Sequence, residues 1–413
     1  MLRRLITVLF LIFVFATTFS ISITQSSLGI CAVLFVIAAI RERFNPFGHG
    51  LRMFWIAAAV YVGWLILVCL LQERPLHSLN NMREEWLFVI VPIGVYLLRD
   101  RRVFDRAMGV LATSVALVSI ASILMYLFRV QYHFGEGFNP LPEANPRVSG
   151  NFVEALTYGN VVAVAGLAIL TWSLYRREKW TPRIWLTLVS GGLGLVSILF
   201  CGGRGPVLAA LIGLIVLLLL LAKSARRWGC MILAAVILVG VLTPSVRSRF
   251  TTELRYHFNA DWPGGRLFIW ERSLEMISDH PLTGVGPGNF DQEYIKRLDS
   301  TVTSKFWYQH AHNDFLEAAA RSGIPGLVSF TLLWAALLYS LGRAWRRASN
   351  DPESRCRLAI GIVGSIVFLA ASMTEATFSD EEVRTVLLVV WAVGLSEVYK
   401  PAETGLARDV SVS

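Results

Sequence analysis

Apolar runs alternate with short polar connections along nearly the whole chain, and most are about as long as a membrane-spanning helix. They lie at residues 5–23, 28–40, 54–71, 86–98, 107–128, 158–175, 184–200, 206–222, 228–242, 323–341, 358–373 and 383–398. A hydrocarbon core about 30 Å thick needs ~20 apolar residues for each helical crossing, and a helix satisfies its own backbone polar groups in lipid. The pattern predicts an all-α polytopic membrane protein with about 12 transmembrane helices.

The first run follows Arg3 and Arg4 and also fits the apolar region of a secretory signal peptide. No small-residue cleavage pattern of the usual kind follows it. We therefore interpret this run as a retained membrane anchor.

One long polar stretch interrupts the apolar pattern. We predict nine spans with short connections in residues 1–242, a large helical loop domain in residues 243–322, three spans in residues 323–400 and a disordered tail in residues 401–413. The composition agrees, because 55% hydrophobic and 16% charged residues exclude an ordinary soluble domain. Five cysteines in or beside the spans have neither metal-ligand nor redox spacing.

Lysine and arginine residues gather in every second connection, which together hold most of the chain's 38 basic residues. Short basic connections stay in the cytoplasm, so we expect both termini inside and the 243–322 loop on the outer face. The net charge of +9 reflects this asymmetry. Because the basic residues are scattered over separate loops, no nucleic-acid partner is expected.

Two arginines lie in outer connections beside turn-forming residues. Arg204 sits in the tight Gly-Gly-Arg-Gly-Pro link at residues 202–206, and Arg147 follows the proline-rich segment 129–151. A guanidinium held in such a place suits bidentate phosphate contact. Contact with ordinary phospholipid or a neighbouring carbonyl is the alternative for Arg204, and simple solvation is the alternative for Arg147.

The first candidate functional residue of the long loop is Arg266. Apolar residues from 267 to 277, including Trp270, have the spacing of an amphipathic helix of about three turns that ends at residues 280–281. A turn with Gly284 and Gly286 follows, and its amides could cradle an anion. It is not a nucleotide loop, since no Walker lysine follows.

Two histidines then precede the next helix. Asn313 or Asp314 is a suitable N-cap, and Asp314 with Glu317 forms a capping-box pattern. His312 therefore lies just before a helix N-terminus, whose positive end favours a neutral imidazole. His310 and His312 could instead bind a metal or serve structure alone, but no partner ligands cluster nearby in the sequence, so we expect no metal site.

These residues resemble the signature of the bacterial O-antigen ligase and polymerase superfamily. The pattern comprises Arg266, Trp270, Met276, His280-Pro281, Gly284, Gly286, His312-Asn313, Leu316, Glu317 and Gly323-Ile324-Pro325-Gly326, within residues 202–326. The twelve-span layout extends the likeness to the whole chain. One departure is that Gly202 and Gly203 stand where the family usually has a serine.

The resemblance implies a membrane glycosyltransferase of the GT-C class that needs no metal or other cofactor. Ligases of this superfamily transfer O-antigen polysaccharide from undecaprenyl diphosphate to lipid A-core oligosaccharide at the periplasmic face of the bacterial inner membrane. The expected partners are thus both lipid-linked substrates and membrane lipids. The resemblance implies that His312 is the general base and that Arg204 and Arg266 stabilise the diphosphate leaving group. The reaction is expected to invert the anomeric carbon. The expected substrate-binding residues are Arg147, His310, Asn313, Trp270, Gly284 and Gly286.

Three alternatives remain open. A polymerase of the same superfamily joins undecaprenyl-linked repeat units and shares the motifs. A lipid-linked oligosaccharide flippase also needs many spans, but it should carry charged or broken helices at mid-membrane depth. A protein-directed transferase is less favoured, because no extra soluble domain follows the last span.

Overall fold

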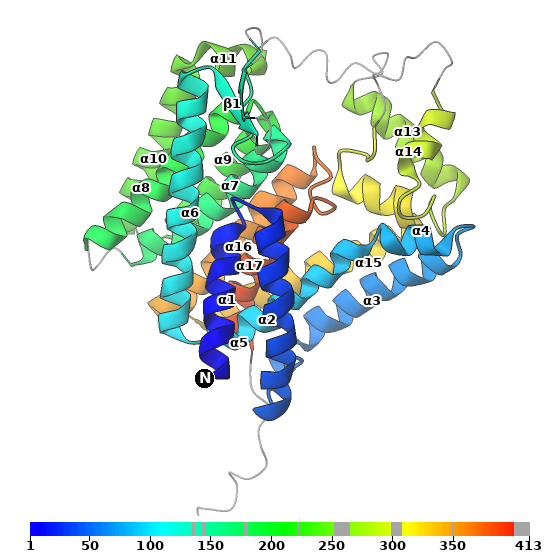
Figure 1. The fold of residues 1–413 in the computed structure, drawn as a ribbon, viewed down its shortest axis with the longest axis horizontal. Coiled ribbons are helices and arrows are strands. Elements are labelled where there is room, and N and C mark those ends of the chain that lie inside the picture. Colours follow the sequence, from blue (N-terminus) through cyan, green and yellow to red (C-terminus); the bar gives the residue numbers. More distant parts are fainter. Residues whose placement is uncertain are drawn as a thin grey trace, which may run out of the picture.

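A computed structural model describes residues 1–133, 137–142, 146–176, 181–221, 223–251, 265–298, 308–348 and 351–399 as an almost entirely helical protein (Figure 1). The helices of the membrane part are α1 (Leu2–Ala16), α2 (Ile21–Arg41), α3 (Arg52–Leu70), α5 (Ile90–Leu98), α6 (Arg101–Leu127), α7 (Ala155–Tyr175), α8 (Pro182–Ser197), α9 (Arg204–Leu220), α10 (Lys223–Leu242), α15 (Asp314–Arg347), α16 (Pro352–Ser372) and α17 (Glu381–Val398). Short helices η1 (His49–Leu51), α4 (Pro75–Asn80), η2 (Arg83–Val89) and η4 (Ile198–Cys201) join them.

Each predicted span except the first, 5–23, falls on helical residues in the described part of the chain. Eight of these helices are long and apolar enough to cross a membrane, which makes the protein an all-α polytopic membrane protein. The segments that fall short are α1, α5 and α9, which have fewer residues, and α17, whose first turn is charged. They pack in the same bundle as the other helices.

The first predicted span was placed wrongly along the chain, and the second lies inside α2 but begins after the start of that helix. The run at 5–23 contains a turn, because α1 ends at Ala16 and α2 begins at Ile21. Ser20 caps α2 through its hydroxyl, which accepts a hydrogen bond from the amide of Ile23 at 3.4 Å. Apolar residues continue on both sides of this turn, so the hydrophobic pattern alone does not reveal it. The two helices lie side by side as a hairpin (Figure 1).

Three further helices and part of α15 make up the described loop domain. They are α11 (Pro244–Thr251), α13 (Arg266–Asp279) and α14 (Phe290–Lys296). The predicted amphipathic helix is confirmed by α13, which ends just before His280. α15 contains a kink at Gly323, where φ is 73°. Its first nine residues belong to the predicted loop domain, and the predicted span follows the kink.

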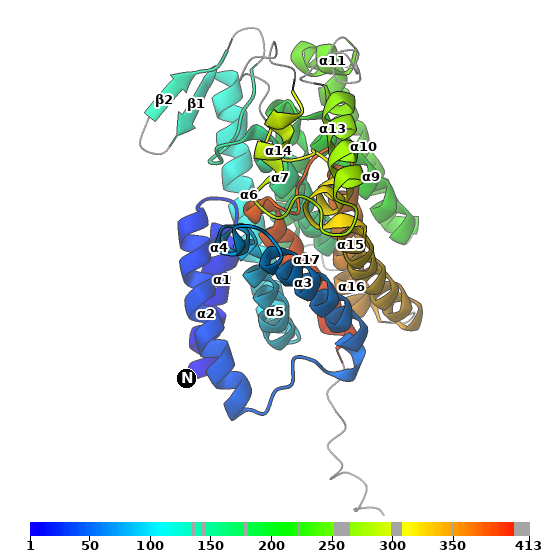
Figure 2. The same ribbon diagram turned by 90° about the vertical axis from the view of Figure 1, so that its right-hand side faces the viewer.

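The segment 129–151 contains strands that the sequence analysis did not predict. β1 (Val130–His133) pairs antiparallel with β2 (Gly137–Pro140), and Figure 2 shows this hairpin projecting from the bundle beyond α6. The predicted tail at 401–413 lies outside the described residues.

The bundle is centred on α7, whose residues are almost all buried, and on α16 and α17 beside it (Figure 2). Small residues permit close packing here. A Cβ at Gly213 of α9 would lie 2.2 Å from Cγ2 of Val367 on α16. This core holds the ends of α15, α16 and α17 at fixed positions, and the candidate site is built on those ends.

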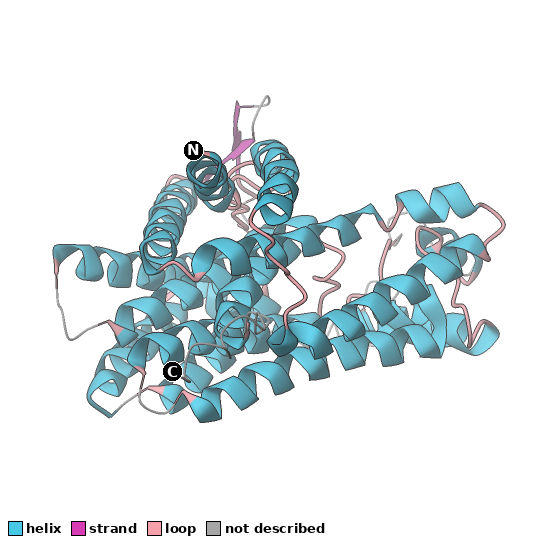
Figure 3. Ribbon diagram, turned by 90° about the horizontal axis from the view of Figure 1, so that it is seen from below, coloured by secondary structure: helices cyan, strands magenta, loops and turns pink. Residues whose placement is uncertain are grey.

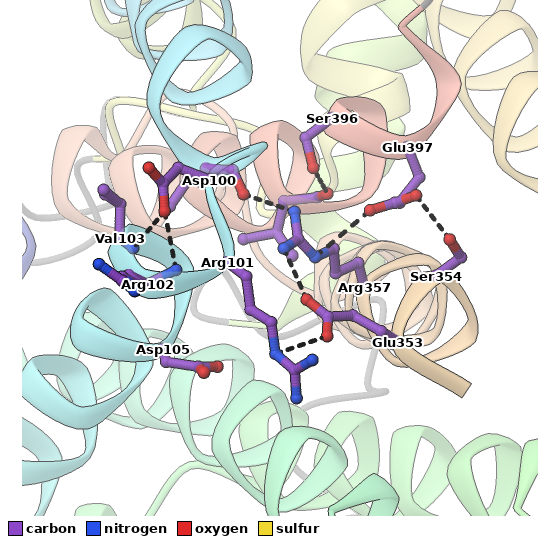
Figure 4. A network of polar contacts seen from close by, with 12 residues as sticks. Asp100, Arg101, Arg102, Val103, Asp105, Glu353, Ser354, Arg357, Ser396 and Glu397 are labelled. Carbon is purple, nitrogen blue, oxygen red and sulfur yellow. Dashed lines mark hydrogen bonds and ion pairs between the residues drawn. The ribbon is translucent and has the colours of Figure 1, made fainter. Parts of the chain in front are cut away.

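A charged cluster joins the helices at the face where α1 begins, which Figure 3 shows from below. The Arg357 side chain is only 3% exposed and pairs with Glu353 at 2.9 Å and with Glu397 at 3.3 Å. Its guanidinium also donates to the carbonyl of Leu98 (Figure 4). The cluster ties α5, α16 and α17 together at the end of the bundle opposite the loop domain.

Candidate functional site

The link between α16 and α17 is fastened to the start of α15. Asn313 is the N-cap of α15, and its side-chain oxygen accepts hydrogen bonds from the amides of Phe315 and Leu316. Its side-chain nitrogen donates to the carbonyl of Met373 at 3.1 Å. Asn313, predicted to bind substrate, therefore has a structural role in which it joins α15 to the link.

The predicted capping box does not form. Asp314 is the first residue of α15 rather than its cap, and its buried carboxylate accepts hydrogen bonds from the Thr377 hydroxyl and the Phe378 amide, both at 2.9 Å. Glu317 accepts from the amide of Ala311 at 2.8 Å. Both acidic groups thus hold the loop and the link in place, because long-range partners replace the local pairing that the sequence pattern indicates.

Glu375 in this link joins the two principal predicted catalytic residues. One carboxylate oxygen lies 2.9 Å from Nδ1 of His312, and the other lies 2.5 Å from Nη2 of Arg266. The three side chains are between 11% and 16% exposed, so water screens the cluster only in part. The sequence analysis did not select Glu375. It is separated from His312 by two complete predicted spans, and no local motif marks it.

The charges of the cluster are set by burial and by mutual contact. Burial lowers the pKa of His312, and the cation of Arg266 lowers it further, against the opposing hydrogen bond with Glu375. Burial alone would raise the pKa of Glu375, but the hydrogen bond with His312 and the charge of Arg266 outweigh it and lower this pKa. At neutral pH the arrangement is a neutral imidazole, a carboxylate and a guanidinium. The neutral imidazole matches the prediction, although burial contributes most to it.

His312 presents one ring nitrogen for chemistry. Its backbone has a positive φ of 51°, unusual for a residue other than glycine. Nδ1 faces Glu375, whereas Nε2 is buried and has no hydrogen-bond partner among the described residues. A carboxylate at Nδ1 favours the tautomer with hydrogen on that atom. Nε2 then carries the lone pair that can accept a proton.

His310 packs against His312 with ring centroids 4.2 Å apart. Burial, together with the neighbouring His312, lowers the pKa of His310 to about 3. A neutral His310 cannot repel an imidazolium at His312 by charge, so it acts as an uncharged wall of the site. Tyr308 covers another side of the His312 ring, at 5.4 Å between ring centroids.

The start of α9 brings Arg204 beside the same link. A Cβ at Gly205 would lie 2.7 Å from the hydroxyl oxygen of Thr374, the neighbour of Glu375. Arg204 is the first residue of α9, so its backbone lies in the layer that holds Glu375. The structure thus places the predicted Arg204 and Arg266 on two sides of one short link.

Arg147 approaches the start of α9 through its backbone. The amide of Val148 donates to the carbonyl of Phe200 at 3.0 Å, four residues before Arg204. The Arg147 side chain is exposed. This placement leaves Arg147 at the rim of the candidate site, available to a charged ligand.

Trp270 lies one helical turn after Arg266 on α13 and so shares its face. Its indole Nε1 is buried without a hydrogen-bond partner in the described ranges. A buried indole N–H normally has an acceptor. Trp270 is therefore a donor that a hydroxyl-rich ligand could satisfy.

The glycine turn has a packing role. The amides of Gly284 and Gly286 donate to the carbonyls of His280 and Arg321 at 2.8 and 3.1 Å. A Cβ at Gly286 would lie 2.4 Å from Cδ of Gln72. With their amides engaged and their backbone in close contact, the two predicted glycines hold the loop against α15 and the segment after α3 rather than offer an anion cradle.

The described residues contain no group of three or more His, Cys, Asp or Glu side chains able to hold a metal ion. The ionisable groups that do converge are Arg266, Glu375 and His312. Their chemistry is that of a proton acceptor held beside a fixed cation.

Comparison with known proteins identifies the segment that carries Arg266 and His312. Residues 189–331 match the family model described as O-antigen ligase. The chain is therefore similar to the O-antigen ligase family over this segment. This match includes Arg204, Arg266 and His312 but stops before Glu375, which lies in the following part of the bundle.

Two curated proteins are similar over parts of their length. The exopolysaccharide production protein ExoQ of Rhizobium meliloti is 24% identical over 133 residues, 30% of this chain and 29% of that protein. An uncharacterised protein of Haemophilus influenzae is 21% identical over 265 residues, 60% of this chain and 63% of that protein. The matches thus span less than two thirds of either relative. The chain is thus similar, over parts of its length, to the O-antigen ligase family and to a protein of exopolysaccharide production.

Proposed function

We propose that this protein is an O-antigen ligase that transfers O-antigen polysaccharide from undecaprenyl diphosphate to lipid A-core oligosaccharide, by inversion and without a metal ion. It would act as a GT-C-type enzyme in the bacterial inner membrane, with both termini in the cytoplasm and the site at the periplasmic face. The observation that carries the proposal is the geometry of His312, whose Nδ1 is held by Glu375 while Nε2 has no partner in the described structure.

The reaction requires one proton acceptor. The acceptor sugar hydroxyl attacks the anomeric carbon, the bond from that carbon to the diphosphate oxygen breaks, and Nε2 of His312 takes the hydroxyl proton. The imidazolium that forms is stabilised by the Glu375 carboxylate at Nδ1. A positioned general base of this kind contributes about 10²- to 10⁴-fold to the rate.

The leaving diphosphate gains negative charge but needs no proton. Guanidinium groups fixed in position before the reaction stabilise such charge effectively. Arg266 is positioned by Glu375, and Arg204 approaches from the start of α9. Arg147 at the rim would contact the diphosphate, and the free N–H of Trp270 would bind a sugar hydroxyl.

Purified protein supplied with undecaprenyl diphosphate-linked polysaccharide and lipid A-core tests the proposal. His312→Ala should lower transfer by about 10²- to 10⁴-fold, whereas His280→Ala, which removes an exposed histidine of the same loop, should not. Full activity in His312→Ala would remove it as the base. Abolition of wild-type activity by a chelator would overturn the metal-independent reaction.

The second candidate is polymerisation, which the partial match to an exopolysaccharide production protein favours. Both reactions use the same donor chemistry and differ in the acceptor. Undecaprenyl-linked repeat units supplied without lipid A-core separate them, because chain growth identifies a polymerase and its absence, with transfer to lipid A-core, identifies a ligase.

A further inference from the structure

A second site lies at the far end of the helix that begins beside His312. A pocket of about 450 Å³ is lined by the last turns of α15, the start of α16, the end of α17 and η1. From Gly323 to Arg347, α15 spans 24 residue steps, which corresponds to ~36 Å at about 1.5 Å per residue. This is comparable to a hydrocarbon core of about 30 Å, so the pocket lies near the opposite membrane surface from the catalytic cluster.

Two exposed guanidiniums dominate the charge of this pocket. Arg343 and Arg347 are four residues apart on α15, so both project from one face. Within the ranges that the structure describes, neither forms an ion pair or a side-chain hydrogen bond. Two unneutralised cations in one concave surface favour an anionic ligand.

The acidic residue of the pocket does not cancel this charge. Glu397 is paired with the buried Arg357 at 3.3 Å and accepts a hydrogen bond from the Ser354 hydroxyl at 2.7 Å. Figure 4 shows both partners turned toward Glu397. Its charge is thus balanced inside the bundle, and the pocket keeps the two positive charges of Arg343 and Arg347.

Apolar surface adjoins the cations. Tyr339, one turn before Arg343, is 48% exposed, and Met53 on α3 is 52% exposed. A ligand that fits both surfaces has a phosphate at the guanidiniums and an apolar chain along Tyr339 and Met53. Basic pockets between membrane helices bind anionic lipid headgroups in this manner.

We propose that this pocket binds an anionic phospholipid of the leaflet opposite the catalytic cluster, through phosphate contacts with Arg343 and Arg347. The bound lipid joins η1, α15, α16 and α17, and it therefore stabilises the bundle end that anchors α15. This proposal does not depend on the proposed transfer reaction, since it concerns a different pair of residues at the other membrane surface.

The chain offers a closely matched control. Arg346 is exposed on the same turn of α15 and forms no ion pair or side-chain hydrogen bond with the described residues, but it does not line the pocket. Arg346→Gln removes the same charge as Arg343→Gln or Arg347→Gln at the same depth. A nonspecific effect of surface charge would affect all three variants equally.

The test measures lipid binding by the full chain. Purified protein is titrated with phosphatidylglycerol or with phosphatidylcholine of the same acyl chains, and retained lipid is counted by native mass spectrometry while thermal unfolding is followed in parallel. Each pocket substitution should weaken phosphatidylglycerol binding about five-fold, the effect of one basic residue at a membrane surface, and the double variant about 25-fold. Arg346→Gln should bind as the wild type does.

Three results would overturn the proposal: unchanged binding by the double variant, an equal loss in Arg346→Gln, or equal binding of phosphatidylcholine. Inorganic phosphate provides a further arm, because protection by phosphate alone would show that the pocket takes a free anion rather than a lipid. Arg343→Lys keeps the charge and should retain most of the binding, which separates lost binding from misfolding.

Discussion

The replacement Glu375→Gln tests whether the carboxylate between His312 and Arg266 serves catalysis or only holds the fold. The substitution keeps the size and hydrogen-bonding capacity of the side chain and removes its charge. In the wild type that charge lies 2.9 Å from Nδ1 of His312. It stabilises the imidazolium that forms when the base accepts a proton, so its loss should weaken the base.

The expected magnitude follows from one charge-assisted hydrogen bond. Such a bond to a charged group contributes about 1.5–3 kcal/mol. If the imidazolium loses this stabilisation, the pKa of His312 falls by about one to two units, at about 1.4 kcal/mol per unit. Because the transition state also contains the imidazolium, the same energy corresponds to a loss of about 10- to 150-fold in kcat/KM.

The sign of the pH effect distinguishes the two roles. His312 must be neutral to act as a base, so kcat/KM falls as the pH drops through its pKa, which burial already holds below the usual value. Without the carboxylate this acid limb should move to still lower pH, while the plateau decreases. A purely structural defect would reduce the plateau and leave the limb where it is.

The assay is transfer of radiolabelled undecaprenyl-linked polysaccharide to lipid A-core at pH 4.5 to 8, with protein from the same purification. Glu381→Gln is the matched control, since Glu381 lies on the first turn of α17, outside the cluster. An acid limb of Glu375→Gln that coincides with the wild-type limb would refute the reasoning, whatever the plateau activity.

Three other predictions concern stability and are tested by unfolding midpoints in detergent. Gly323→Ala should destabilise the protein by about 1–3 kcal/mol, because φ at this kink is 73° and a Cβ would collide with a backbone carbonyl; Gly342→Ala, with open space around it, should have no such cost. Arg384→Ala should cost about 3–5 kcal/mol by leaving the largely enclosed Glu85 carboxylate without its partner, and a milder loss in the double variant with Glu85→Gln would support that cause. The pKa of His310 is lowered from 6.5 to about 3, so its share of the stability is present above pH 6.5 and is lost as the pH falls toward 3, at up to about 1.4 kcal/mol per unit. His310→Asn should flatten this dependence, and an unchanged slope would contradict it.

Hydrophobic patterning was sufficient to predict the helical bundle, because crossing a membrane requires long apolar helices irrespective of how they pack. It failed where composition does not change at a boundary. The turn between α1 and α2 lies within continuous apolar sequence, and only the hydroxyl of Ser20 marks it. The hairpin of β1 and β2 was missed for a related reason, since its four-residue strands are too short for a clear alternating pattern.

The candidate site likewise contains residues that the sequence predicted and a residue that it did not. Arg266 and His312 were predicted because motifs in one loop contain them, whereas Glu375 follows the complete helix α16 and is brought to His312 only by tertiary packing. The folding of the link 373–380 onto α15 depends on Asn313 and Asp314, whose side chains bind its backbone and Thr377. The sequence around these two residues predicts helix-capping groups. It cannot show that their other hydrogen-bond partners lie some 60 residues away in the chain. A polar residue just outside an apolar span is therefore a better candidate for a long-range partner than its immediate sequence suggests. In this chain the short links between helices are the places to look for the groups that orient the loop histidines.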